Sequence, residues 1–441
     1  MKRILAALAT VLPLTLLAPI SVSAAEVGNS IETASISAFS NGSRTLSAIQ
    51  LSALGKVVQD KYAAHALSCT GIRLASEPSA VLVLAKARAK ASCDAAKKFN
   101  PNLKITIATK TSKLAADRNR VALSFEVMPY PKTPLTLERL DINWVGRAAV
   151  SNVLNYFNSA APSTATRTVV QGPNVPSGFA KSSLALLDKA ARMFSSEYTA
   201  SYTVVFFSER DGVWAEQKLA ELGGRFPGSL AGYVNSLPSA KNCGFAFSTW
   251  DKKGAPIYYA CLNTLSYKGL GADHTPIHEY FHFVQNTKYQ TADTYIPLWV
   301  NEGPPVFFGF ALAYGASDRA NQSAQKFFGY APLFDPNGTG VIDTKRISTF
   351  LKTATDAQIV SLYQQLELDP QNRDALNHYG FGGIAAEVLV AVYGADTYLN
   401  FLDETRFSSW QVAFEKTYGL SPTSFYEKLA PYVRAIGKKY F

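Results

Sequence analysis

The sequence predicts an α+β protein in which a small β-α-β-α-β-β sandwich is followed by a mainly helical region with an antiparallel sheet. Two observations support this fold class. Over residues 30–128, short β-branched or alternating runs are interleaved with two longer stretches of helical apolar spacing. Over residues 176–441, most apolar patterns are helical, and strand-like runs are confined to the beginning. Separate strand-rich and helix-rich regions are typical of α+β folds.

The extreme N-terminus, residues 1–24, has the composition of a secretory signal peptide. Lys2 and Arg3 form a positive end, an apolar stretch follows, and Val22-Ser23-Ala24 supplies small residues before the expected cleavage site. A membrane anchor is less consistent with the sequence, because two prolines interrupt the apolar stretch and no stop-transfer segment follows. We therefore expect a secreted or cell-envelope protein with no membrane span after removal of the signal.

Charge and cysteine content agree with an exported protein. The formal net charge is +10, of which +2 lies in the signal peptide, and this excess favours acidic wall polymers over nucleic acid, for which no basic run or known module is present. The four cysteines form two local pairs, Cys69 with Cys93 and Cys243 with Cys261. An even number of cysteines in an exported chain predicts two disulfides, most simply within these pairs, although other connectivities stay open.

The predicted sandwich, residues 30–128, has its helices on one face of the sheet. Its expected strands are 36–39, 65–74, 104–109 and 121–127, and its expected helices are 47–63 and 78–99. Residues 129–175 follow as a connector, rich in proline, serine and threonine, with one short helix at 149–161.

Several local features of the first region resemble the OmpA-like domain, a peptidoglycan-binding module of envelope proteins. They are the opening turn FSNGSRTLS, a Cys-x-Gly second strand, Arg88 inside the second helix and a DRNRV string before the last strand. In that family an aspartate after the second strand and the helix arginine hold the diaminopimelate of the wall peptide. Arg88 matches the arginine, but the aspartate is missing, because Gly71 is followed by Ile72 and Arg73, so this is a degenerate version. A wall-binding domain, a scaffold without a ligand, and a merely solvated Arg88 remain alternatives.

The helical region begins with strand and helix patterns that lead to a histidine motif. The expected elements are helices at 179–198 and 214–222, strands at 202–207, 245–249 and 257–262, and later helices at 306–314, 384–393, 409–418 and 423–436.

The motif HEYFH places His278 and His282 four residues apart, on one face of a helix that Thr275 is suited to cap. Two neutral imidazoles at this spacing are good zinc ligands, and Glu279 between them is placed to take a proton from a metal-bound water. Glu302, within the string WVNEG, is the candidate third ligand. An ordinary amphipathic helix that matches by chance is the alternative.

HEYFHFVQ and the later WVNEG resemble the active-site segments of the gluzincin metallopeptidases, the thermolysin and aminopeptidase N clan. The resemblance covers roughly residues 175–441 and implies one Zn²⁺ ion held by His278, His282 and Glu302. It implies peptide hydrolysis by a zinc-activated water with Glu279 as general base. It also implies an oxyanion donor from the C-terminal region, for which Tyr379 is the first candidate and His378 the second; a tyrosine that only packs at a helix start is the alternative. Finally, it implies a substrate-binding edge strand, for which 257–262 is the candidate and an ordinary core hairpin the alternative.

The sequence departs from that family after Glu302. Pro304 and Pro305 imply that Glu302 lies at or just before a helix start. Val306 stands where thermolysin-like members have an aspartate, and the amine-binding Gly-x-Met-x-Asn motif of aminopeptidases is missing. His274 is interpreted as an outer-shell group or, more simply, a solvated loop histidine.

Two further functions stay open. One is a non-catalytic envelope or peptidoglycan-binding protein with an inactive peptidase scaffold, which would lack stoichiometric metal. The other is a zinc hydrolase that acts on wall peptide cross-links.

Overall fold

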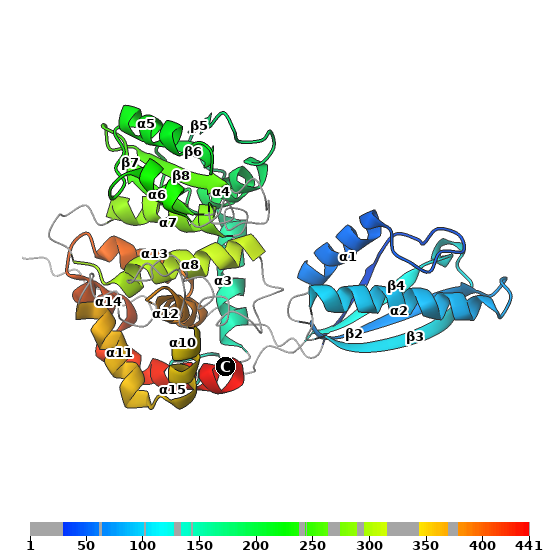
Figure 1. The fold of residues 1–441 in the computed structure, drawn as a ribbon. Coiled ribbons are helices and arrows are strands. Elements are labelled where there is room, and N and C mark those ends of the chain that lie inside the picture. The colour runs from blue at the N-terminus through cyan, green and yellow to red at the C-terminus, as the bar shows by residue number, and fades with distance from the viewer. Residues whose placement is uncertain are drawn as a thin grey trace, which may run out of the picture.

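The computed structural model describes residues 30–60, 64–100, 103–127, 134–142, 144–237, 243, 245–262, 274–288, 295–314, 344–368 and 378–440. The predicted signal peptide lies outside the described residues. The described part is a mixed α/β structure with two four-stranded sheets, consistent with the predicted α+β class (Figure 1).

The first region has the predicted element order. The sheet runs β1-β4-β2-β3, in which β1 and β2 pair antiparallel with β4 and β2 pairs parallel with β3. The bounds are β1 Ser30–Ser35, α1 Ala48–Asp60, β2 Ala64–Leu74, α2 Val81–Phe99, β3 Lys104–Ser112 and β4 Val121–Val127. The first strand was expected at 36–39, which is wrong. Ile36 and Phe39 are buried in the core after the strand has ended.

The core of this region lies between one sheet face and the two helices. Leu67, Leu123 and Phe125 point into it from the strands, and Leu54 and Ala89 from the helices. In addition, Cys69 of β2 and Cys93 of α2 lie at disulfide distance, with Cα atoms 5.9 Å apart. Their pairing, compatible with the predicted disulfide, ties the sheet to its covering helix.

The second sheet has the order β5-β6-β8-β7 and is mixed, so the predicted antiparallel sheet is wrong. β5 pairs parallel with β6 and β6 parallel with β8, whereas only β7 and β8 are antiparallel. The reason is connectivity, because α5 and α6 separate β6 from β8 and such helical crossovers join parallel strands. The bounds are β5 Arg167–Gln171, β6 Tyr202–Ser208, α5 Gly212–Leu222, α6 Leu230–Ser236, β7 Ala246–Trp250 and β8 Pro256–Leu262.

All seven residues of β8 are buried, and the strand has a neighbour on each side. The expectation that 257–262 forms a substrate-binding edge is therefore wrong. Among the described strands, the edge next to β8 is β7. The second cysteine pair, Cys243 and Cys261, has Cα atoms 5.3 Å apart, and it is compatible with a disulfide between β8 and the segment before β7.

Helices make up the other described elements that follow the first region, and most of them lie below this sheet in Figure 1. Their bounds are α3 Val145–Ser159, α4 Lys181–Met193, α7 Thr275–Lys288, α8 Leu298–Tyr314, α10 Thr344–Thr353, α11 Asp356–Leu368, α12 His378–Tyr393, α13 Ala395–Glu404, α14 Trp410–Tyr418 and α15 Pro422–Tyr440. The range predicted as connector contains α3 and β5, which pack against α12 and β6 respectively. Within the described residues, no helix is both long and apolar enough to span a membrane.

Helices α8 and α12 cross at a pair of glycines. A Cβ atom on Gly303 would lie 2.2 Å from the backbone carbon of Gly382, and one on Gly382 would lie 2.4 Å from the Trp299 carbonyl oxygen. Only glycine permits this approach. The crossing fixes the start of α12 against the part of α8 that carries Glu302.

Candidate metal centre

The helix α7 presents the two motif histidines from an almost fully buried position. Its first turn is closed by the carbonyl of His274, which accepts from the amides of Ile277 and His278. The α7 side chains Tyr280, Phe281 and Phe283 are buried among other aromatic rings, which fixes the rotation of the helix. The opposite face of α7 therefore holds its histidines toward α8.

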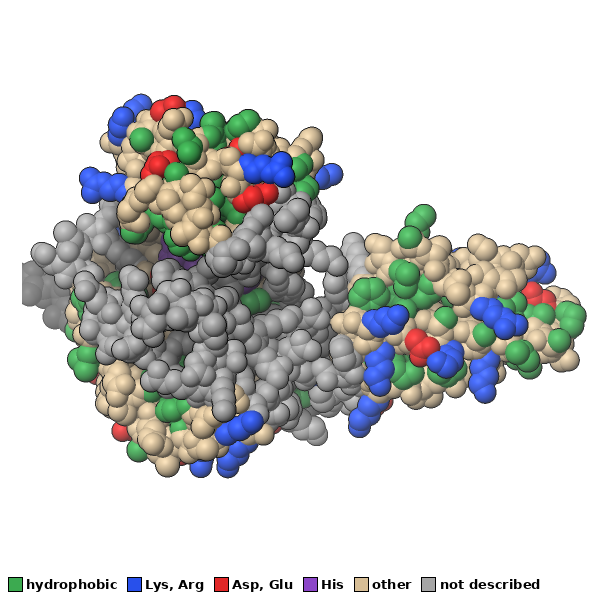
Figure 2. All heavy atoms as spheres, viewed as in Figure 1, with side chains coloured by type: hydrophobic (Ala, Val, Ile, Leu, Met, Phe, Trp, Pro, Cys, Tyr) green, Lys and Arg blue, Asp and Glu red, His purple; other side chains and the backbone are tan. Residues whose placement is uncertain are grey.

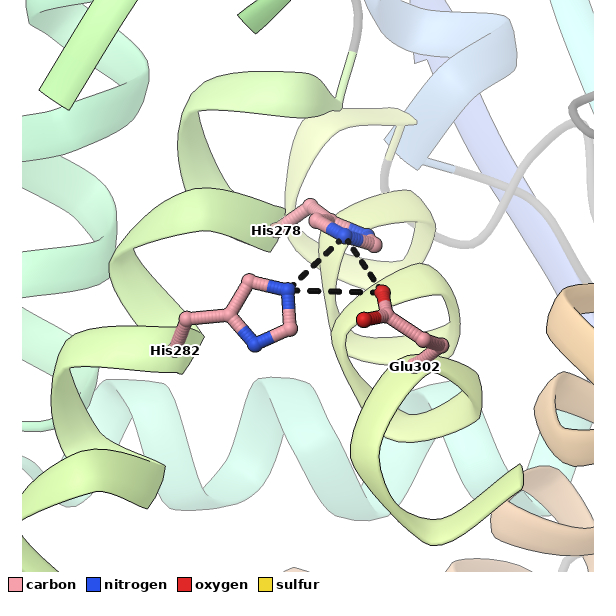
Figure 3. Close-up of side chains that lie close together, drawn as sticks. All are labelled: His278, His282 and Glu302. Carbon is pink, nitrogen blue, oxygen red and sulfur yellow. Dashed lines mark hydrogen bonds and ion pairs between the residues drawn. The ribbon is translucent and has the colours of Figure 1, made fainter. Parts of the chain in front are cut away.

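Three donor atoms from α7 and α8 meet at this face (Figure 3). The Nε2 atoms of His278 and His282 are 3.2 Å apart, and each lies 3.4 Å from Oε2 of Glu302. Four donors about 2.05 Å from a zinc ion at tetrahedral corners are about 3.3 Å apart. The three atoms thus form a nearly equilateral triangle with the size of one face of a zinc coordination tetrahedron. Two imidazoles and one carboxylate are also the donor set of catalytic zinc sites with an open fourth position.

The charges of this cluster are strongly coupled. Burial by itself raises the pKa of Glu302, but the charges of the two histidines and the hydrogen bonds from them hold this pKa well below its usual range. Burial lowers the pKa of His282, whereas Glu302, then Glu279 and the hydrogen bond with Gln285 raise it, with a net pKa of about 9. The cluster therefore favours an ionised carboxylate beside positive charge, the electrostatic setting that a divalent cation also satisfies.

Glu302 lies inside α8, not at or before its start as expected. The helix begins at Leu298, so Glu302 is in its second turn and Pro304 and Pro305 are interior residues. Its second carboxylate oxygen, Oε1, accepts a hydrogen bond of 3.1 Å from the Asn301 side-chain amide. One oxygen is thus held by the neighbouring residue while the other points at the histidines.

Gln285, one turn beyond His282 on α7, links the two helices. Its side chain is fully buried. Oε1 lies 2.7 Å from Nδ1 of His282, and Nε2 donates to the backbone carbonyls of Val300, at 3.3 Å, and Asn301, at 2.9 Å. The i, i+3 spacing after His282 is a sequence signal that could have revealed this contact.

Glu279 is positioned by the second sheet. Its Oε2 accepts a 2.6 Å hydrogen bond from the hydroxyl of Ser248, in the middle of the edge strand β7. Glu279 is nearly buried, with 6% of its surface exposed. No local pattern marks Ser248 in the sequence, because its role depends on the packing of β7 against α7.

The candidate oxyanion donors lie at the start of α12. The ring of Tyr379 stacks on His278 with centroids 6.1 Å apart, and the ring of His378 lies 4.4 Å from that of Tyr379. Tyr379 thus brings its ring to the histidine pair from the start of α12. Its part in chemistry stays a prediction.

The interpretation of His274 as a solvated loop histidine is wrong. It is 2% exposed and stacks on Phe310 of α8 with ring centroids 3.9 Å apart. Gly309 gives it room, since a Cβ atom there would lie 3.1 Å from the His274 carbonyl oxygen. His274 thus belongs to the α7–α8 packing. Val306, at the position of the family's aspartate, is buried in the same core.

Arg88 is not a solvated helix charge either. It is 1% exposed, and its guanidinium donates to the carbonyls of Ser43 and Ser40 and to Oδ1 of Asn119, at 2.7, 3.1 and 2.8 Å. It also lies over the ring of Phe39. These contacts hold the loop after β1 and the turn before β4, which gives Arg88 a structural role.

Comparisons with protein-family models, with curated proteins and with solved structures find no significant match for this chain. The functional argument therefore depends on the site itself.

Proposed function

We propose that the protein is an exported zinc-dependent peptidase of gluzincin type. The observation that carries the proposal is the triangle formed by His278, His282 and Glu302, with sides of 3.2, 3.4 and 3.4 Å. Such a compact set of two imidazoles and an ionised carboxylate suits Zn²⁺. The proposed extracytoplasmic location is supported by two cysteine pairs at disulfide distance.

The chain's own groups supply proton transfer and orientation. When bound, a zinc ion lowers the pKa of a water and polarises a carbonyl. Glu279 lies one residue from the first ligand, and we assign to it the removal of a proton from water and its delivery to the leaving amine. The hydroxyl of Ser248 holds one carboxylate oxygen and leaves the other for this work. Tyr379, stacked near His278, is the proposed hydrogen-bond donor to the oxyanion.

The edge strand β7 supports a peptide as substrate. A strand with one unpaired edge can bind an extended peptide by main-chain hydrogen bonds. Among the described strands β7 is such an edge, and its central Ser248 contacts Glu279. A peptide added along β7 would therefore pass close to the proposed base.

Metal analysis of the secreted protein combined with digestion of a peptide library tests this function. We expect one zinc per chain and metal-dependent cleavage. Glu279→Gln keeps the shape of the side chain but removes its basicity, so turnover should fall by at least about 100-fold. Zinc content should remain unchanged. Peptide hydrolysis by Glu279→Gln at the wild-type rate would show that Glu279 is not the base.

Attachment to an acidic wall polymer through residues 30–128 is a second candidate function, either alone or beside catalysis. This range holds 14 Lys and Arg against 6 Asp and Glu, whereas the rest of the mature chain is nearly neutral. Basic side chains are spread over the visible face of this region in Figure 2. Specific diaminopimelate binding through Arg88 is less favoured, because its guanidinium already has three protein partners. If the protein binds the polymer but contains no zinc, the purely non-catalytic alternative is favoured. Digestion of muropeptides tests the other alternative, hydrolysis of wall peptide cross-links.

A further inference from the structure

The two prolines that follow Glu302 leave two backbone carbonyls of α8 without their usual helical donors. In an α-helix the amide of residue i donates to the carbonyl of residue i−4. Proline has no amide hydrogen, so Pro304 and Pro305 free the carbonyls of Val300 and Asn301. Because a buried carbonyl without a donor is destabilising, another group must satisfy each of them.

The side-chain amide of Gln285 is that group. Its Nε2 donates to both freed carbonyls, at 3.3 Å to Val300 and 2.9 Å to Asn301. Only the NH₂ end of an amide can face two carbonyl oxygens, so this pair fixes which way the amide is turned. Its Oε1 must then point away from α8, and it lies 2.7 Å from Nδ1 of His282.

This orientation determines the tautomer of the ligand histidine. Oε1 is an acceptor, so Nδ1 of His282 must carry a hydrogen. In neutral His282 the lone pair is then on Nε2, the atom that lies 3.4 Å from Oε2 of Glu302. Pro304 and Pro305 of α8 therefore fix the amide of Gln285, and Gln285 in turn orients the imidazole of His282 on α7.

We propose that Gln285 is a positioning residue for metal binding, and that Pro304 and Pro305 are part of the same device. This inference rests on the proposed function, because it assigns a role toward the zinc that the three ligands would hold. Removal of a hydrogen-bond partner behind a histidine ligand typically lowers metal affinity by about 10- to 100-fold.

The test compares Gln285→Met with wild type in the full secreted chain. Zinc affinity is measured by competition with a chelator, and the visible spectrum of the Co²⁺-substituted protein reports ligand geometry. We expect a 10- to 100-fold weaker zinc affinity and an altered cobalt spectrum. Gln285→Glu keeps an acceptor for Nδ1 of His282 and should retain more affinity than Gln285→Met, although it loses the donors to α8.

A second comparison separates the link to the prolines from simple loss of packing. Pro304→Ala combined with Pro305→Ala restores two amide hydrogens, which can donate to the carbonyls of Val300 and Asn301. In this background Gln285→Met should lower the thermal stability of the metal-free protein less than it does in wild type. Its effect on zinc affinity should persist.

Asn152 provides the matched control. From α3, its side-chain amide also donates to two successive helix carbonyls, those of Val390 at 2.8 Å and Ala391 at 3.5 Å. These carbonyls lie near the C-terminal end of α12, whereas Tyr379, which stacks on His278, is at its start. Asn152→Leu should lower stability but leave zinc affinity and the cobalt spectrum unchanged.

Wild-type zinc affinity and cobalt spectrum in Gln285→Met would overturn the positioning role while leaving the proposed peptidase intact. Equal stability losses from Gln285→Met with and without the prolines would overturn their part in the device. If the wild-type chain binds no zinc, the proposed function and the positioning role both fail.

Discussion

At the scale of single residues, the candidate site depends on polar neighbours that each hold one atom of a functional side chain. Asn301 holds the carboxylate oxygen of Glu302 that points away from the histidines. Gln285 contacts Nδ1 of His282, and Ser248 contacts one oxygen of Glu279. In each case the second atom of the group is left to face the site. Because each neighbour holds one atom and leaves the other free, a few amides and hydroxyls orient these three side chains of the candidate site.

Ser248→Ala tests whether the hydrogen bond from Ser248 orients the proposed base, Glu279. The variant removes the hydrogen bond that holds Oε2 of Glu279, so the carboxylate loses its fixed orientation. We expect kcat to fall about tenfold, the equivalent of one hydrogen bond to a charged group. Zinc content should not change, because Ser248 contacts no ligand in the described structure. Steady-state kinetics with a library-derived peptide check the prediction, and an unchanged kcat would contradict it. Ser248→Thr, which retains the hydroxyl, is the matched control.

At the scale of elements, the site is a product of how α7, α8 and α12 pack. Trp299, fully buried, contacts the rings of Tyr363, Trp410 and Tyr426 and anchors the first turn of α8. One turn further, Gly303 meets Gly382 of α12. The WVNEG string thus combines an aromatic anchor, a ligand and a helix-crossing glycine within five positions.

Gly303→Ala should disturb this packing strongly. Its Cβ atom would lie 2.2 Å from backbone of α12, which no side-chain rotation can relieve. We expect the free energy of unfolding to fall by about 3 kcal/mol, at the upper end for overpacking. Gly232→Ala in α6 is the control, because its Cβ atom would meet only the side chain of Ser229, at 3.3 Å. Chemical denaturation followed by circular dichroism measures both, and equal stabilities for the two variants would refute the argument.

The elements also show how far the sequence could be interpreted. The histidine spacing and the Asn-Glu-Gly string single out three residues that lie together in the structure. The two histidines are found from their spacing within one helix, and Glu302 from being a carboxylate, a residue type that binds zinc. The extent of α8 was missed, since proline usually marks a helix end and the compensating Gln285 lies on another helix. The strand direction in the second sheet and the central place of β8 follow from long-range pairing, which no local pattern specifies. The burial of His274 and Arg88 likewise depends on tertiary contacts.

At the scale of the whole molecule, the excess positive charge and the candidate metal centre lie in different parts of the chain. Residues 30–128 have a formal net charge of +8, whereas residues 129–441, which contain the candidate metal centre, have almost no net charge. The exposed lysines of α2 and β3 include Lys86, Lys97, Lys104 and Lys110. A polymer with repeated negative charges would attract this region over about a Debye length, and added salt would screen the attraction.

The full secreted chain should therefore bind an immobilised acidic wall polymer at low ionic strength and elute as salt rises. At 1 M salt the Debye length is about 3 Å, so an attraction between exposed charges should be lost. Replacing Lys86 and Lys97 together by Glu changes the net charge of the region by four units and should move elution to clearly lower salt. Lys181→Glu and Lys253→Glu, at two exposed lysines outside residues 30–128, change the charge by the same four units and should have a smaller effect. Retention that changes neither with salt nor with the two α2 substitutions would show that residues 30–128 do not act as an electrostatic anchor.

The same experiment with Glu279→Gln separates attachment from the proposed catalysis. Retention of this variant that still depends on salt and on the α2 lysines would place the two functions in separate regions of the chain.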